Sequence, residues 1–390
     1  MKKEFIKGVA AGITFSLAVA AGGYAGYKIR DEGVLSEPEH VQKIRALETL
    51  IHRDYLGEID EEQLAEGLYS GLVYGLGDPY SRYYTAEEYK QENSATMGAY
   101  VGIGVTMQKN REGGVEIVEC YEGGPASNAG VKTGDIISAI DDTDITDMEV
   151  SEVADMIREG EKKQAVLTIH RQNEEVPLKL TVEITDVTLP SVFEEMLKDQ
   201  VGYIRISEFT DVTPDQFREA FSSLKKQGMK KLIVDLRGNP GGLLTSVCSI
   251  LNEILPEGLI VYTEDKYGER QEQRSEGKTP LDMPFAVLVN ENSASASEIF
   301  AGAVQDHGIG TIVGTTTYGK GVVQELLPLK DGSAVKLTIS DYYTPKGNSI
   351  NNTGITPDVE VKLDPELLNQ EEITHEEDNQ LQEALKVLKK

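Results

Sequence analysis

The stretch Phe285-Ala-Val-Leu-Val-Asn-Glu-Asn-Ser-Ala-Ser-Ala-Ser-Glu298 joins a short apolar run to a cluster of small polar residues. Its first part, residues 285–289, predicts a buried strand, and residues 299–306 after it predict a helix. A serine at such a junction lies at a helix N-terminus, where unpaired N–H groups and the helix dipole favour negative charge. An acyl-transfer nucleophile requires this setting, because its intermediate carries an oxyanion.

The same residues allow a purely structural interpretation. Ser295-Ala-Ser-Glu298 fits a capping box, in which the serine caps the helix and the glutamate reaches back to it. Ser293 and Ser297 are also plausible helix caps. The junction alone does not separate capping from catalysis, so the remaining motifs decide between them.

Composition limits the class of protein. The chain has 390 residues, 39% hydrophobic and 27% charged, which indicates a globular protein of two or three domains. Its formal net charge of −28 argues against nucleic acid as a partner, because phosphates would repel it. The two cysteines, Cys120 and Cys248, do not indicate a disulfide framework, and both are predicted as small core residues.

The first 30 residues indicate export. Lys2, Lys3 and Lys7 precede residues 8–27, which carry no charge, and twenty residues of helix span about 30 Å, the thickness of a bilayer core. The segment is either an uncleaved membrane anchor or a signal peptide cut after Ala20. Both interpretations place the rest of the chain outside the cytoplasm, either anchored to the cell membrane or secreted.

The pattern changes along the chain and predicts a multidomain α/β protein. Apolar residues at helical spacing predict a small helical domain over 36–97. From 187 to 363, strands and helices alternate, which predicts an α/β core. Residues 364–390 form an acidic and then helical tail, interpreted either as a frayed end or as a dimerisation element. Under the second interpretation, we expect a homodimer formed through the N- and C-terminal helices.

Residues 98–186 resemble a PDZ domain. The run Pro125-Ala-Ser-Asn-Ala-Gly-Val-Lys-Thr-Gly-Asp135 before an Ile-rich strand is typical of that family. The loop Tyr100-Val101-Gly102-Ile103-Gly104 matches the place where PDZ domains bind a peptide carboxylate. Glycines let backbone N–H groups approach the carboxylate, and the adjoining strand edge pairs with an extended peptide. Such a domain would bind proteins with exposed apolar C-termini.

Three segments of the α/β core carry polar groups. Asp235-Leu-Arg-Gly-Asn-Pro-Gly-Gly242 offers N–H donors after a strand, and the serine cluster follows another strand. Tyr318-Gly-Lys-Gly-Val-Val-Gln324 supplies a lysine and a glutamine four positions apart. Residues with that spacing face the same way in a strand or a helix, so Lys320 and Gln324 are predicted to point at one place.

Together these motifs resemble the carboxyl-terminal processing peptidases, or tail-specific proteases, of the S41 type. The resemblance extends over almost the whole chain, including Gly77-Asp-Pro-Tyr-Ser81 and Gly354-Ile-Thr-Pro-Asp358. It implies a crotonase-like core in which Ser295 is the nucleophile, Lys320 the general base and Gln324 the residue that orients the base. It also implies, less specifically, that Arg171 couples peptide binding to the core.

The implied chemistry is physically consistent. Lysine in water, with a pKa of about 10.4, cannot accept the serine proton, but burial disfavours the ammonium and lowers that pKa. Gln324 can accept a hydrogen bond without adding a charge that would retain the ammonium. The expected oxyanion donors are the N–H of Ala296 and that of Gly241 or Gly242. Arg237 is expected to brace the core rather than touch substrate.

Other classes of site are less consistent with the sequence. Of the five histidines, only His307 lies near Ser295, and twelve residues of helix separate the two by about 18 Å. No metal-binding spacing occurs, and the chemistry needs no cofactor. The sequence therefore predicts an exported serine endopeptidase that recognises C-terminal tails. The alternatives are an inactive PDZ scaffold that only binds tails, and a crotonase-like enzyme acting on a thioester.

Overall fold

The computed structural model describes residues 33–111, 113–159, 163–367, 370 and 373–389. The predicted membrane anchor or signal peptide, residues 1–30, lies outside these described residues. Among the helices that are described, none combines the length and the apolar character needed to cross a membrane. The chain divides into two units, residues 1–68 and 69–390.

The described part of the first unit, residues 33–68, is helical. The helical domain expected over 36–97 extends beyond this unit and also contains the strand β1 (Arg82–Tyr84). A short 3-10 turn, η1 (Val34–Ser36), precedes α2 (Pro38–Asp54), and α3 (Glu61–Tyr74) begins in this unit. Proline in the first turn suits the start of α2, because the missing N–H would have no helical partner there. No side chain of α2 is buried, so apolar residues such as Leu47 and Leu50 remain exposed.

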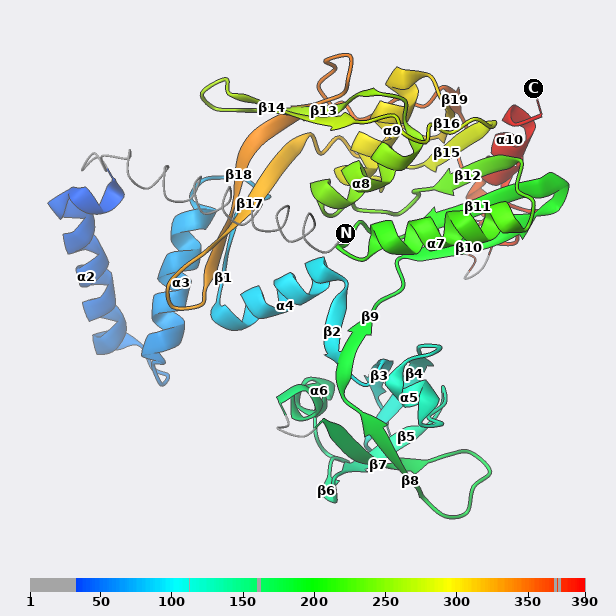
Figure 1. Ribbon diagram of the computed structural model, residues 1–390. Coiled ribbons are helices and arrows are strands. Elements are labelled where there is room, and N and C mark those ends of the chain that lie inside the picture. Colours follow the sequence, from blue (N-terminus) through cyan, green and yellow to red (C-terminus); the bar gives the residue numbers. More distant parts are fainter. Residues whose placement is uncertain (1–32, 112, 160–162, 368–369, 371–372, 390) are drawn as a thin grey trace, which may run out of the picture. The chain divides into compact units, whose positions relative to one another are not determined.

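A six-stranded sheet forms the centre of the second unit (Figure 1). Its neighbouring strands are parallel except for the antiparallel pair β10–β11. In spatial order the strands are β10 (Val192–Leu197), β11 (Val201–Ile206), β12 (Lys231–Asp235), β15 (Phe285–Val289), β16 (Thr311–Gly314) and β19 (Val359–Glu360).

Helices cover both faces of this sheet because its strands are apolar on both sides. Leu232 and Val287 pack with α7 (Thr213–Lys226), α8 (Leu244–Ile254) and α9 (Ala296–His307) in one core cluster. Their neighbours Ile233 and Leu288 pack with α10 (Asn379–Val387) in another. Alternate residues of a strand point to opposite faces, so one apolar run supplies two cores.

The tail helix α10 is confirmed, but its predicted role is corrected. Leu381 and Ala384 are fully buried against the central sheet, together with Leu388. The helix is therefore not a frayed end. The apolar side of α10 is also not free to bind a second chain, because it packs into the core of its own chain.

A second sheet carries the segment after Lys320. β17 (Val322–Pro328) and β18 (Ala334–Tyr343) form the predicted hairpin, and β18 also pairs with β1 (Arg82–Tyr84) and β13 (Gly258–Asp265). The edge strand β14 (Arg270–Ser275) pairs with β13 and was not predicted, because its sequence is polar throughout. Helix α4 (Ala86–Met97) follows β1 and starts with a complete capping box between Thr85 and Glu88.

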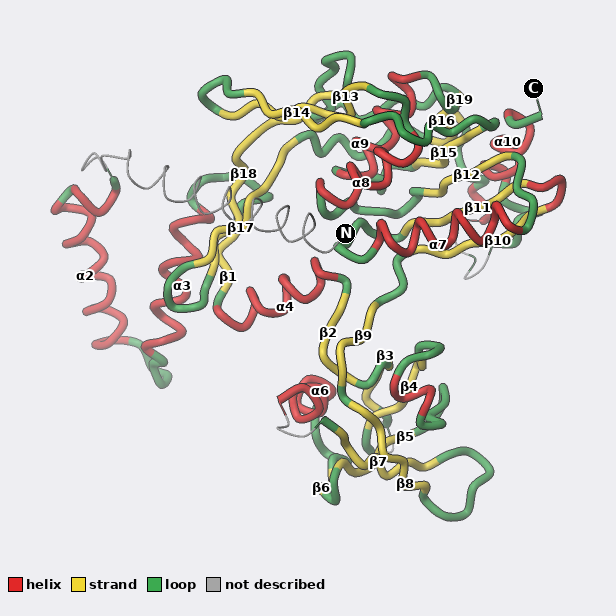
Figure 2. Tube along the Cα trace, in the orientation of Figure 1, coloured by secondary structure: helices red, strands yellow, loops and turns green. Residues whose placement is uncertain are grey.

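The block predicted as a PDZ domain over 98–186 corresponds to the elements from β2 to β9, and Figure 2 separates its strands from helix α6 by colour. β2 (Ala99–Gly102) and β9 (Thr185–Thr188) pair at its two ends. Between them a five-strand path, with β6 (Thr143–Asp144) attached to β5, surrounds a separate apolar core that includes Cys120. The path is β3 (Val105–Lys109), β4 (Val115–Cys120), β5 (Ile136–Ile140), β7 (Gln164–His170) and β8 (Leu178–Glu183), with helices α5 (Pro125–Asn128) and α6 (Val150–Glu159).

Candidate active site

Ser295 occupies the predicted junction between a strand and a helix. β15 ends at Val289, α9 begins at Ala296, and Ser295 is the residue immediately before the helix. Its backbone has φ 52° and ψ −114°, a conformation that residues with a side chain rarely adopt. Strain of this kind persists only where the surroundings enforce it, and it is common at active sites.

The two flanking serines have structural roles. The buried Ser293 hydroxyl donates to the carbonyl of Leu236 (2.8 Å), and the buried Ser297 hydroxyl donates to the carbonyl of Asn239 (3.0 Å). Both therefore attach the serine segment to the glycine-rich turn after β12. Ser295, between them, is only partly buried and keeps its hydroxyl accessible.

The glycine-rich turn packs directly on Ser295. A Cβ atom at Gly241 would lie 2.7 Å from the Ser295 Cβ, so only glycine fits there. The Gly241 N–H donates to the side-chain oxygen of buried Asn239 (2.8 Å). This corrects the prediction for Gly241: its donor is already used, and its contribution is close packing.

Gly242 and Ala296 remain as candidate oxyanion donors. Gly242 lies opposite Phe209 in a parallel bridge formed by the Gly241 carbonyl and the Leu243 N–H, so its own N–H takes no part. Ala296 is the first residue of α9, where N–H groups have no helical partner. Both residues line a cavity of about 350 Å³ together with Ser295 and Lys320.

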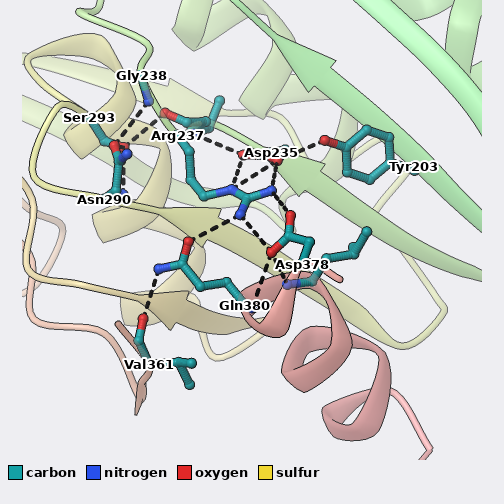
Figure 3. Close-up of polar contacts among 11 residues, drawn as sticks. Tyr203, Asp235, Arg237, Gly238, Asn290, Ser293, Val361, Asp378 and Gln380 are labelled. Carbon is teal, nitrogen blue, oxygen red and sulfur yellow. Dashed lines mark hydrogen bonds and ion pairs between the residues drawn. The ribbon is translucent and has the colours of Figure 1, made fainter. Parts of the chain in front are cut away.

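A buried arginine fixes the start of the glycine-rich turn (Figure 3). Arg237 donates to Asp235 and to Asp378, with shortest distances of 2.6 and 2.8 Å, and to Gln380. Burial disfavours ionisation of Asp378, but the hydrogen bonds and charge of Arg237 outweigh it and keep the pKa of that carboxyl below its usual value. Arg237 braces the core, as predicted, and it connects the turn to α10.

Glu298 connects the nucleophile to the segment that carries the base. Its side chain is completely buried in the first turn of α9. One carboxylate oxygen accepts from the N–H groups of Ser295 and Lys320, both at 2.9 Å. The other accepts from the Thr317 hydroxyl at 2.6 Å and the Gly319 N–H at 2.7 Å. The predicted cap is therefore also the link between two site segments.

Lys320 lies in an environment that favours its neutral form. Burial is the largest cause of its lowered pKa, and the positive charge of Lys336 adds to it, while Asp78, Glu298 and Glu92 oppose it. Its ammonium nitrogen lies 4.8 Å from the centre of the Tyr80 ring, within cation–π range. This lowered pKa has the direction that burial was expected to cause.

The side chains of Ser295 and Lys320 line one cavity but contact different tyrosines, Tyr342 and Tyr80 respectively. The buried Tyr342 hydroxyl donates to the Lys320 carbonyl and has a hydrogen bond with the Ser295 side chain. Burial is the largest reason that the pKa of Tyr342 lies well above its usual value. Among the residues that the structure describes, Ser295 and Lys320 are not hydrogen-bonded to each other.

Gln324 differs from the expectation that it orients Lys320. Its amide nitrogen lies 3.3 Å from the Thr338 hydroxyl and 3.4 Å from the Val322 carbonyl. The strand has an irregularity between Val323 and Gln324, which interrupts the simple alternation of side chains. Gln324 does line the same cavity as Lys320, and its role in orienting the base stays a prediction.

The expected peptide-binding loop lines a groove of about 270 Å³ in the PDZ block. Tyr100, Val101 and Gly102 contribute to it from strand β2 rather than from a loop, Ile103 from the residue after it, and Ala154, Ile157 and Arg158 from α6. Gly104 has φ +81°, which favours glycine. Arg171 bonds with Asp135 and the Gly130 carbonyl inside this block, and its coupling to the core stays a prediction.

Sequence reasoning missed several residues of this site. Tyr80 belongs to the motif Gly77-Asp-Pro-Tyr-Ser81, to which no role in the site was assigned, and Glu298 was interpreted only as a cap. Tyr342 and Lys336 lie on β18, where nothing in the local pattern identifies their neighbours. The one available signal was that Lys336 is a charged residue inside a strand of mostly apolar and small residues.

Three family models match parts of this chain. Residues 200–361 match peptidase family S41, residues 116–171 a PDZ domain, and residues 17–88 the "Activating protease CtpB N-terminal domain". Residues 200–361 of this chain belong to peptidase family S41. The matched region includes the segments that carry Ser295 and Lys320.

Two staphylococcal relatives bear the name "Probable CtpA-like serine protease". The protein of Staphylococcus aureus (strain COL) is 35% identical over 340 residues, 86% of this chain and 66% of its own length. The protein of Staphylococcus epidermidis (strain ATCC 35984) is 34% identical over 328 residues, 83% and 65% respectively. This chain thus spans slightly less than two thirds of either relative.

A solved structure supports the fold. The putative S41 protease from Bacteroides fragilis is 19% identical and aligns with a TM-score of 0.50 over 88% of this chain and 97% of its own. At that identity the likeness concerns the fold alone.

Replacing Glu298 by glutamine tests the link between the two site segments. In the variant, the NH2 group of the glutamine amide replaces one carboxylate oxygen and faces two of the four groups that now donate to Glu298. Each donor left without an acceptor costs about 1–3 kcal/mol of unfolding free energy. Displacement of Ser295 or Lys320 by about 1 Å lowers the labelling rate of Ser295 by a fluorophosphonate probe roughly 100-fold. The exposed Glu325→Gln variant is the control. Labelling of the Glu298→Gln variant at the wild-type rate would contradict the assigned link.

Proposed function

We propose that this chain is a serine endopeptidase that cleaves through an acyl-enzyme on Ser295. The proposal is carried by one observation: a strained, accessible serine and a lysine with a lowered pKa line the same cavity as the Gly242 and Ala296 backbone. Family membership supports it, and the chemistry requires only groups that the chain supplies.

In the proposed reaction Lys320 acts first as a base. Its neutral amine takes the Ser295 proton as the hydroxyl oxygen attacks the scissile carbonyl. The oxyanion then lies between the N–H groups of Ala296 and Gly242, each worth about 3 kcal/mol of transition-state stabilisation. Lys320 returns the proton to the leaving amine, and a water molecule, activated in the same way, hydrolyses the acyl-enzyme.

This reaction requires a change from the described arrangement. Lys320 has to leave the Tyr80 ring, and the Ser295 hydroxyl has to turn from Tyr342 toward the amine. Both are rotations of side chains whose backbone is already fixed by Glu298. We infer that the described arrangement is a resting state and that substrate in the cavity favours the working one.

Substitution of the two reactive side chains tests the activity. Ser295→Ala and Lys320→Ala should each lower cleavage of an unfolded protein with an apolar tail by at least roughly a thousandfold. A fluorophosphonate probe should label the wild type, and Ser295→Ala should not be labelled. Ser222→Ala and Lys330→Ala, both exposed, are the matched controls. Cleavage retained by Ser295→Ala would rule out the assignment, and a wild type that binds tails without cutting them would indicate the inactive scaffold.

We further propose that the PDZ groove captures the free C-terminus of the substrate. The groove combines the glycine loop with apolar Ile103 and Ile157, which suits an apolar last residue. Its small volume limits capture to the end of an extended chain.

Tail capture can be measured on the full-length Ser295→Ala variant by calorimetry. A peptide with an apolar last residue and a free carboxylate should bind, because backbone N–H groups donate to that charge. The C-terminal amide of the same peptide should bind roughly tenfold more weakly, since a hydrogen bond to a charged group contributes about 1.5–3 kcal/mol. Equal affinity for the acid and the amide would exclude carboxylate recognition.

Location and assembly are also proposals. The uncharged segment 8–27 supports export with the catalytic part outside the cytoplasm, and the mass of the mature N-terminus distinguishes an anchor from a cleaved signal. The exposed leucines of α2 support a homodimer formed through the N-terminal helices. Sedimentation of the chain should show a dimer that Leu47→Glu with Leu50→Glu disrupts. A monomer at every concentration would contradict this.

A further inference from the structure

The active-site cavity contains a second lysine, Lys336. It lies on β18, is about one third exposed, and lines the cavity together with Lys320 and Ser295. Its ammonium nitrogen lies 2.7 Å from a carboxylate oxygen of Glu92 on α4, which also lines the cavity. An ion pair thus forms part of the wall of the cavity in which the base has to lose its proton.

The surroundings of the two lysines shift their pKa values in opposite directions. Burial lowers the pKa of Lys320 most, and the charge of Lys336 lowers it further. Burial also disfavours the charge of Lys336, but the hydrogen bond and charge of Glu92, with help from Tyr84, outweigh it and raise its pKa. Lys336 therefore keeps its proton in the pH range in which Lys320 gives up its own.

We propose that Lys336 is an electrostatic positioning residue of the catalytic centre: its fixed positive charge keeps Lys320 neutral, and Glu92 on α4 adjusts the strength of that effect. The inference rests on the proposed function of Lys320 as the general base. In this role Lys336 and Glu92 act on the charge of Lys320 and do not themselves form or break a bond.

Other charged or titratable groups also face Lys320, and they decide the sign of each substitution. Glu92 favours the ammonium form of Lys320, as do Asp78 and Glu298, whereas Lys336 disfavours it. The groups to be kept intact are Asp78 and Tyr80 from the turn before β1, Glu298 from α9, and Tyr342 from β18. Among the described charged groups that act on Lys320, the Lys336–Glu92 pair combines two opposite charges that can be removed separately.

The experiment measures the rate at which a fluorophosphonate probe acylates Ser295 as a function of pH. The wild-type rate should rise with pH as Lys320 becomes neutral. Lys336→Met removes a repelling charge and leaves Glu92 unpaired, so the rise should move to higher pH. At the wild-type midpoint the rate should fall roughly three- to tenfold, and it should recover at high pH.

Glu92→Gln should do the opposite. It removes an attracting charge and leaves Lys336 unpaired, so the rise should move to lower pH. The double variant should lie between the two, and Lys336→Arg, which keeps the charge, should retain the wild-type profile. Lys330→Met, at the exposed turn of the same hairpin, is the control for loss of a lysine.

The outcomes separate this inference from the proposed function. Failure of the wild type to react at Ser295 would overturn the proposed function itself. A wild type that reacts, with Lys336→Met slower by the same factor at every pH, would reduce Lys336 to a packing residue and overturn the inference. Shifts of Lys336→Met and Glu92→Gln in the same direction would also overturn it. Opposite shifts, with Lys336→Arg unchanged, would establish it.

Discussion

One buried carboxylate organises the catalytic centre. Glu298 accepts hydrogen bonds from the backbone of Ser295 and Lys320, so the nucleophile and the base are fixed to the same two oxygen atoms. A buried charge is tolerated only when its hydrogen-bonding capacity is filled, and here two further donors complete it. These four donors are neutral groups, so no cation takes part in the hydrogen bonds that hold the carboxylate.

The rest of the site is arranged around this link. The glycine-rich turn can approach Ser295 because Gly241 has no side chain. Hydrogen bonds of Asn239 with Gly241 and of Arg237 with Asp235 fix the conformation of the turn. The strained backbone of Ser295 is thereby enforced from two sides, by the turn and by α9. The proposed reaction requires only the side chains of Ser295 and Lys320 to rotate, because Glu298 holds the backbone N–H groups of both residues.

The sequence predicted what depends on local pattern. The apolar run 285–289 and the small residues after it identified the junction, and the hairpin around 330–333 was correct. It could not identify what depends on tertiary contact. Nothing near Gly241 shows that Asn239 occupies its N–H, and nothing near Gln324 shows the irregularity that turns it toward Thr338. Tyr342 and Lys336 entered the site through strand pairing, which a single sequence does not specify.

The most direct test is a crystal structure of the full chain with an acyl or phosphonate group on Ser295. The account predicts that the Lys320 nitrogen has left the Tyr80 ring and lies about 3 Å from the Ser295 oxygen. It also predicts that the four hydrogen bonds to Glu298 are unchanged. A modified serine with Lys320 still on Tyr80, or with the Glu298 contacts broken, would contradict the account.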